Sequence, residues 1–78
     1  MKKTFKIGEE AVGGIITISE AGKRAYKVEC KDYYTKKVVQ WTYLYSFTEL
    51  VDYLEYVSSH YHADRMSKHF QTAVDKSE

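Results

Sequence analysis

Hydrophobic and polar positions alternate along the first half of the chain in the pattern of antiparallel strands. Between Ala25 and Lys31, three apolar residues (Tyr26, Val28 and Cys30) share one side, and three charged residues share the other. A period of two with one polar side indicates a strand that covers a core on one face and meets solvent on the other. We therefore predict a half-buried strand at Ala25–Lys31.

Three more segments have the composition of strands, and polar or glycine-containing connections separate them. They are Thr4–Gly8, Ile15–Ser19 and Lys37–Tyr45. Gly22 is the natural site for a positive φ angle in the second connection, and Gly13-Gly14 marks a turn or bulge in the first. Short connections between successive strands favour a β-meander.

The segment Lys37–Tyr45 differs from the other strands because neither of its sides is polar throughout. One side holds Lys37, Val39, Trp41, Tyr43 and Tyr45, and the other holds Val38, Gln40, Thr42 and Leu44. Helices can cover only one side of such a sheet. The other side then leaves aromatic or apolar surface exposed unless a second molecule covers it.

The period changes from two to about 3.6 after Tyr45. Ser46 and Glu49 form the capping box of a helix, with Tyr45 and Leu50 placed as a hydrophobic staple. One apolar stripe then follows, consisting of Phe47, Leu50, Val51, Leu54, Val57 and Tyr61.

A second apolar stripe, rotated roughly 80° to 180° from the first at about 100° per residue, consists of Ala63, Met66, Phe70, Ala73 and Val74. One straight helix would expose one of the two stripes. We therefore predict a break near Ser59–His62 and a helical hairpin. A continuous helix that dimerises is the alternative, since the break contains no glycine or proline.

Together these elements predict an α+β fold, an antiparallel three- to four-stranded β-meander followed by two short helices packed on one face (ββββαα). With 78 residues, the chain has room for one core, so 1–78 is expected to be a single domain. Such small cores leave little spare stability, and association of two chains would add to it, so we keep a homodimer as an alternative to a monomer.

Charge divides between the two halves of the chain, although the net charge is only +1. Residues 1–45 carry nine basic and five acidic residues, and residues 46–78 carry three and six. The single cysteine cannot form an internal disulfide, and no apolar run approaches the roughly 20 residues of a membrane span. We expect a cytoplasmic protein that does not enter a membrane.

Catalytic or metal chemistry has few candidates. His60, His62 and His69, with Asp64, are the only possible metal cluster, and His60 and His62 point about 200° apart in a helix. Cys30 lies on the apolar side of its strand, which predicts a buried structural thiol. We expect neither an enzyme nor a protein with a cofactor or metal.

Two groups of residues are candidates for protein binding. The connection before the last strand combines adjacent aromatic and cationic side chains, and the polar side of the first helix combines acidic side chains with a tyrosine. The two groups are Tyr33, Tyr34, Lys36 and Lys37, and Glu49, Asp52 and Tyr56.

The order of strand, glycine turn, strand, polar turn, strand and capped helix also resembles a known family. The stretches 15–23, Ala25–Lys31 and 46–50 are similar to a small phage-encoded anti-CRISPR protein of type I-F systems. The opening 3–8 (Lys-Thr-Phe-Lys-Ile-Gly) looks like the start of a type II-C anti-CRISPR protein. Ser19 stands where the type I-F family has a tyrosine, so no interface residue is carried over. The resemblance implies a phage or mobile-element inhibitor that blocks a host CRISPR effector (Cas) protein sterically, without a cofactor.

A second class of function is nucleic-acid binding. A three-stranded sheet followed by a helix also resembles the amino-terminal DNA-binding domains of some mobile-element integrases. Its phosphate contacts would come from a basic β-sheet face, here Lys23, Arg24, Lys27, Lys31, Lys36 and Lys37. Glu29 lies on the same side as Lys27 and Lys31, and the net charge is well below that usual for DNA-binding domains. We therefore keep this function as the alternative.

Overall fold

A computed structural model of the chain describes residues 2–8, 14–22 and 25–77, and the side chains as far as Phe70. Four antiparallel strands form one sheet in the order β1-β2-β3-β4. They are β1 (Lys2–Lys6), β2 (Ile15–Glu20), β3 (Tyr26–Lys31) and β4 (Val38–Leu44). Two helices follow, α1 (Phe47–Val57) and α2 (His60–Ser77). The predicted ββββαα fold is confirmed.

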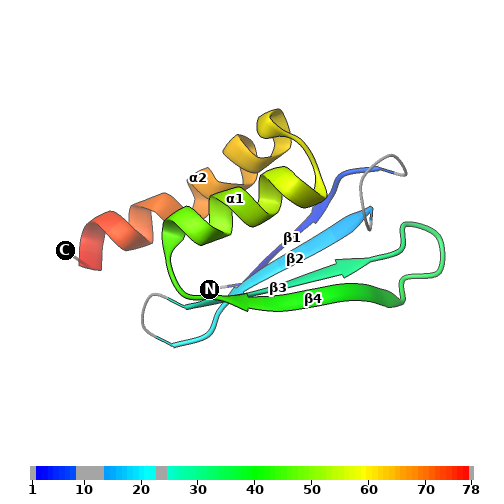
Figure 1. The fold of residues 1–78 in the computed structure, drawn as a ribbon, viewed down its shortest axis with the longest axis horizontal. Helices are drawn as coiled ribbons and strands as arrows, with labels where there is room; N and C mark the ends of the chain where they lie inside the picture. Colours follow the sequence, from blue (N-terminus) through cyan, green and yellow to red (C-terminus); the bar gives the residue numbers. More distant parts are fainter. Residues whose placement is uncertain (1, 9–13, 23–24, 78) are drawn as a thin grey trace.

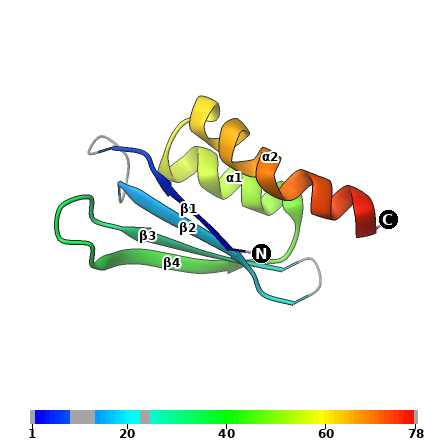
Figure 2. The same cartoon turned by 180° about the vertical axis from the view of Figure 1, so that it is seen from behind.

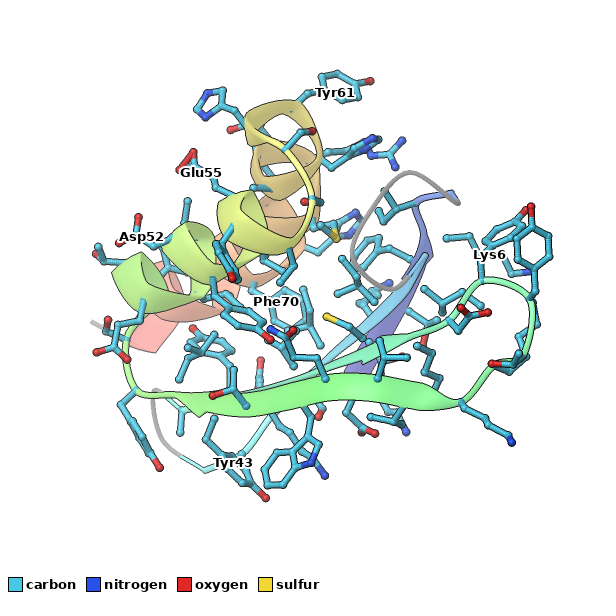
Figure 3. All side chains as sticks on the ribbon, turned by 45° about the vertical axis from the view of Figure 1, so that its right-hand side comes forward. Lys6, Tyr43, Asp52, Glu55, Tyr61 and Phe70 are labelled. Atoms are coloured by element: carbon cyan, nitrogen blue, oxygen red, sulfur yellow. The ribbon has the colours of Figure 1, made fainter. Side chains whose placement is uncertain are left out.

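Both helices lie on the same face of the sheet, and the opposite face has no helix (Figures 1 and 2). The core between the two layers is apolar: Ile16, Ile18, Tyr26, Val28, Cys30, Leu44, Leu50, Leu54, Val57, Ala63, Met66 and Phe70. The ring of Phe70 meets the ring of Tyr26 edge-on, with 6.0 Å between the centroids. Figure 3 shows Phe70 between the helices and the sheet. Burial of this core supplies the main favourable term in folding.

The first strand begins and ends earlier than the sequence predicted. Residues Lys2–Lys6 pair with β2, whereas Thr4–Gly8 was expected. The amides of Ile7 and Gly8 both donate to the carbonyl oxygen of Gly14, at 2.7 and 3.2 Å. Gly8 has a φ of 124°, which ends the extended conformation. Gly22 has a φ of 88°, as predicted, and Gly13 lies outside the described residues.

The helical hairpin is confirmed, and two adjacent serines form its corner. The Ser58 amide and hydroxyl both donate to the Leu54 carbonyl, at 3.0 and 2.5 Å, and so end α1. Ser59 begins α2, since its hydroxyl oxygen accepts from the His62 amide at 3.3 Å and its carbonyl from the Ala63 amide at 2.8 Å. The corner therefore needs neither glycine nor proline.

The change of direction at this corner shows that one prediction, the burial of Tyr61, is wrong. Tyr61 was placed on the first apolar stripe, but its side chain is 68% exposed because α1 ends four residues earlier, at Val57. The second stripe is buried as predicted at Ala63, Met66 and Phe70. Its last two members, Ala73 and Val74, have no described side chains.

The start of α1 follows the capping prediction with one change. The Ser46 hydroxyl oxygen accepts from the Glu49 amide at 3.1 Å, as in a capping box. The Glu49 carboxylate, however, accepts from the Tyr45 amide at 3.0 Å, one residue earlier than expected. Tyr45 is 70% exposed, so little of its ring is buried in the predicted staple.

Within the part of the chain that the structure describes, neither helix combines the length and the apolar character that crossing a lipid bilayer requires.

Candidate functional site

The uncovered face of the sheet is the largest candidate site. Strand register places every second side chain there, because successive residues of a strand point to opposite faces. The Thr4 and Thr17 hydroxyls, for example, lie 3.1 Å apart on this face. We define the uncovered face by these residues: Lys2, Thr4, Lys6, Ile15, Thr17, Ser19, Lys27, Glu29, Lys31, Trp41 and Tyr43.

Trp41 and Tyr43 are the aromatic pair of this face. Their side chains are 56% and 44% exposed, and their rings meet edge-on with 5.7 Å between the centroids. Figure 3 shows Tyr43 pointing away from the helices, below β4. Half-exposed Trp and Tyr rings offer a large apolar area with a polar group at the edge, the combination favoured in binding surfaces.

Lys27 on the neighbouring strand fixes the surroundings of the aromatic pair. Its ammonium nitrogen lies 5.5 Å from the Trp41 ring centroid and 5.9 Å from that of Tyr43. It also lies 3.8 Å from a carboxylate oxygen of Glu29. A cation within about 6 Å of an aromatic face is attracted by the ring quadrupole. The aromatic pair is thereby held in a defined arrangement without being buried.

The β3–β4 connection holds the first predicted group. One oxygen of the Asp32 carboxylate accepts from the amides of Tyr34 and Thr35, at 2.8 and 2.9 Å. These bonds, with that of Thr35 the larger cause, lower the pKa of Asp32. Lys36 has a positive φ of 64°, and its amide donates to the Asp32 carbonyl at 3.0 Å. The connection is therefore a tight, internally bonded turn.

Within this turn the four predicted side chains differ in availability. Tyr34 is 69% exposed and Lys37 is exposed as well. The Lys36 ammonium donates to the Tyr33 carbonyl at 2.8 Å and lies 5.2 Å from the centroid of the Tyr33 ring. Tyr33 is half-buried, so it serves the turn itself. Tyr34 and Lys37 are the members best placed for a partner.

The second predicted group lies on the outer side of α1. Glu49, Asp52 and Tyr56 are all exposed, Tyr56 to 76%. Asp52 and Glu55 project outward from the helix in Figure 3. The prediction that this side faces solvent is therefore confirmed, and its role in binding stays a prediction.

The structure does not bring the two predicted groups together. The β3–β4 connection lies at one end of the sheet, and the start of α1, which carries Glu49 and Asp52, lies at the other (Figures 1 and 2). β4 connects them, with Lys37 before its first residue and Glu49 shortly after its last. A single chain therefore cannot use both groups as one small contact site.

Cys30 is a buried thiol, as predicted, with no exposed surface. Burial raises the pKa of the Cys30 thiol, and a hydrogen bond with Tyr53 opposes this in part. The Tyr53 hydroxyl also accepts from the Gln40 side-chain amide at 2.6 Å. A protonated, buried thiol is a poor nucleophile, which fits a structural role.

Two of the three histidines, His60 and His69, have separate partners. His60 lies 2.6 Å from a carboxylate oxygen of Glu55, and the His69 ring packs against Phe5 with 5.3 Å between centroids. Over residues 2–8, 14–22 and 25–70, no three His, Cys, Asp or Glu side chains gather closely enough to hold a metal ion.

The aromatic pair is the feature that sequence reasoning did not assign. Alternation placed Trp41 and Tyr43 on one side of their strand, but both sides of that strand carry apolar residues, so the covered side could not be chosen. The signal was available in β3, where Lys27 and Glu29 pair with Tyr43 and Trp41. A side of β4 that shares a face with charged neighbours is the solvent side.

Comparison of the chain with protein-family models, with curated proteins and with solved structures finds no match.

Proposed function

We propose that this chain is a phage or mobile-element inhibitor that binds a host CRISPR effector protein, and that it does so with the uncovered face of its sheet. The observation that carries the binding site is the half-exposed aromatic pair, Trp41 and Tyr43, held by Lys27 on a face without helices. Interfaces gain most of their affinity from a few such anchors. The choice of partner rests on the resemblance to anti-CRISPR proteins described above.

Inhibition of this kind is steric. The inhibitor covers a working surface of the effector and needs no nucleophile, metal or cofactor of its own. A sheet that is stable without its partner loses little conformational entropy on binding, which favours affinity. The uncovered face meets this requirement because each of its strands is paired with a neighbour, with one irregularity, at the start of β4.

The experiment is a DNA-cleavage assay with purified type I-F and type II-C effectors, with and without the chain. We expect cleavage by one of them to be inhibited, and Trp41→Ala with Tyr43→Ala to abolish inhibition. Two control variants leave the aromatic pair intact, namely Tyr56→Ala on α1, and Tyr34→Ala with Lys37→Ala in the turn. Circular dichroism verifies that each variant is folded.

The controls also test the earlier predictions of the site. Loss of inhibition with the turn variant, but not with the sheet variant, would move the contact to the β3–β4 connection. Full activity of both effectors in the presence of a large excess of the chain would contradict the proposal.

A second candidate function, nucleic-acid binding, is favoured by the charges of the same face. Lys2, Lys6, Lys27 and Lys31 stand there against Glu29 as the one acidic residue of the described face. Lys23 and Arg24, also expected to contact phosphates, lie outside the described residues. Binding of a labelled DNA that weakens steeply with salt, together with unimpaired effectors, would support this function instead.

A further inference from the structure

The two edges of the sheet differ in a way that bears on self-association. An edge strand presents unpaired backbone groups, and proteins commonly protect such edges with charged side chains, lysine above all. β1 carries Lys2, Lys3 and Lys6 within five residues. β4, with the sequence Val-Val-Gln-Trp-Thr-Tyr-Leu, carries no charge. The β4 edge is therefore open to pairing, and the β1 edge is not.

The exposed apolar surface is concentrated on the same strand. Four of its seven side chains are large hydrophobic residues that are at least 43% exposed: Val38, Val39, Trp41 and Tyr43. Pairing along β4 would cover part of this surface and satisfy the outward backbone groups in one step.

The charges flanking β4 indicate what pairs with it. Lys37 precedes the strand, and at its other end the Glu49 carboxylate is held at the Tyr45 amide by a 3.0 Å hydrogen bond. When a second β4 runs antiparallel, each end of the strand meets the opposite end of its copy. Lys37 of each chain then approaches Glu49 of the other, once on each side of the twofold axis. Opposite charges at both ends make the edge complementary to itself.

From this edge we infer that the chain forms a twofold-symmetric dimer through antiparallel pairing of β4 with β4 of a second copy. Centring the seven residues of the strand on the twofold axis sets the register, with Trp41 opposite its own copy. The irregularity between β3 and β4 lies opposite Cys30 and Lys31, at the start of β4, so Gln40, Trp41 and Thr42 at the axis are regular. The result is a continuous eight-stranded sheet.

This dimer also brings together what a single chain separates. The cationic turn of one copy and the acidic start of α1 of the other come to lie side by side. Two uncovered faces join into one, with both aromatic pairs near its middle. The inference concerns self-association and does not depend on the identity of the partner proposed above.

The first test is the mass of the chain in solution by sedimentation velocity over a dilution series. We expect a species of twice the 9.1 kDa chain mass that dissociates on dilution. Trp41→Lys places two like charges directly opposite each other at the axis and should leave only monomer. The control, Thr4→Lys, introduces a lysine on the same face of the other edge strand, β1, and should leave the dimer unchanged.

A charge-exchange series tests the pairing of the ends. Lys37→Glu alone and Glu49→Lys alone should each weaken the dimer, and the two together in one chain should restore it. Glu49→Lys also removes a contact at the helix start, so the thermal unfolding of each variant is measured alongside. A purely structural effect of Glu49→Lys would not be reversed by Lys37→Glu.

Disulfide trapping tests the register. The cysteine of Trp41→Cys lies opposite the same cysteine of the second copy and should give a covalent dimer on oxidation. The cysteine of Tyr43→Cys lies opposite Val39 of the second copy, so Tyr43→Cys should not give a covalent dimer. Monomer at every concentration, a dimer unaffected by Trp41→Lys, or trapping by Tyr43→Cys but not by Trp41→Cys would each overturn the inference. If β4 pairs only with a strand of another protein and not with its own copy, the purified chain should be a monomer at every concentration.

Discussion

Gly14 lies where two pieces of backbone approach too closely for a side chain. A Cβ atom at this position would be 2.5 Å from the Cβ of Tyr33 and 2.7 Å from the carbonyl oxygen of Gly8. Gly14 also receives the hydrogen bonds of the Ile7 and Gly8 amides. The requirement at Gly14 is therefore space, whereas the requirement at Gly22 is a positive φ angle.

We expect Gly14→Ala to destabilise the fold by about 1–3 kcal/mol, since neither the Gly8 carbonyl oxygen nor the Tyr33 Cβ can move independently of the backbone. Urea denaturation measures this loss, and NMR chemical shifts of Tyr33 and Tyr34 should change. Gly22→Ala is the matched control: its cost, about 1 kcal/mol, comes from φ alone and should leave both tyrosines undisturbed. Unchanged stability of Gly14→Ala would contradict the close approach.

Single residues with one dominant local interaction were predictable from the sequence. Ser46 caps α1, Gly22 takes the positive φ, and Cys30 is buried, because each depends on neighbours close along the chain. The hydrogen bond of the Glu49 carboxylate was missed by one residue, because the donor is the amide of Tyr45 and not that of Ser46. The exposure of Tyr61 was missed entirely, since it depends on where α1 ends.

At the scale of elements, the corner between α1 and α2 joins two helices through Ser58 and Ser59. The rotation of the apolar stripe predicted this corner, and the serines explain its position at the start of the predicted range. An ion pair joins the two helices across this corner, because Glu55 near the end of α1 reaches His60 at the start of α2.

The corner should therefore respond to pH. The hydrogen bond that Glu55 accepts from the His60 ring, followed by the charge of Glu55, raises the pKa of His60 above the ordinary value of 6.5. A raised pKa in the folded state means that the stabilisation is fully present below the ordinary pKa and is lost as pH rises through the raised one. NMR titration should show a lower pKa for His60 in Glu55→Gln than in the unaltered chain.

Thermal unfolding provides the control for this prediction. The stability advantage of the unaltered chain over Glu55→Gln should shrink as pH rises through the titration of His60. A difference that stays constant across this range, or equal pKa values for His60 in both chains, would show that the pair does not link the helices.

The choice of face for β4 was the main element-scale question that the sequence left open. Both of its sides carry apolar residues, so periodicity could not say which one the helices cover. Pairing with β3 decides it, because Trp41 and Tyr43 share a face with Glu29 and Lys27. Such information is a contact between strands, not a property of either strand alone.

At the scale of the whole molecule, stability rests on the small core that the described residues form between the sheet and the helices. Phe70 has no exposed surface and lies against Tyr26. We expect Phe70→Ala to cost about 3–5 kcal/mol, a large part of the roughly 5–15 kcal/mol available to a typical domain. Urea denaturation measures it, and Lys68→Ala, an exposed neighbour on α2, should change stability by less than about 0.5 kcal/mol. A small effect of Phe70→Ala would mean that α2 contributes little to the fold.

The charge difference between the two halves of the chain becomes a difference between two layers. The described part of the sheet's uncovered face is mainly basic, whereas the outer side of α1 carries Glu49, Asp52 and Glu55. The sequence predicted the segregation of charge, but only the arrangement of the helices on one face turns it into two opposite surfaces. Screening at cellular salt limits its reach to about 8 Å.

Trp41 is the one tryptophan of the sequence, and it lies half exposed on the uncovered face. Tryptophan is highly buried on average in folded proteins, and the fluorescence of a buried indole reports folding. Here the indole is already in contact with water in the native state, so unfolding should shift its emission little. Covering the face by a partner, or placing the indole opposite its own copy in the dimer, should shift the emission to shorter wavelength. The chain thus carries an intrinsic optical probe of association rather than of folding.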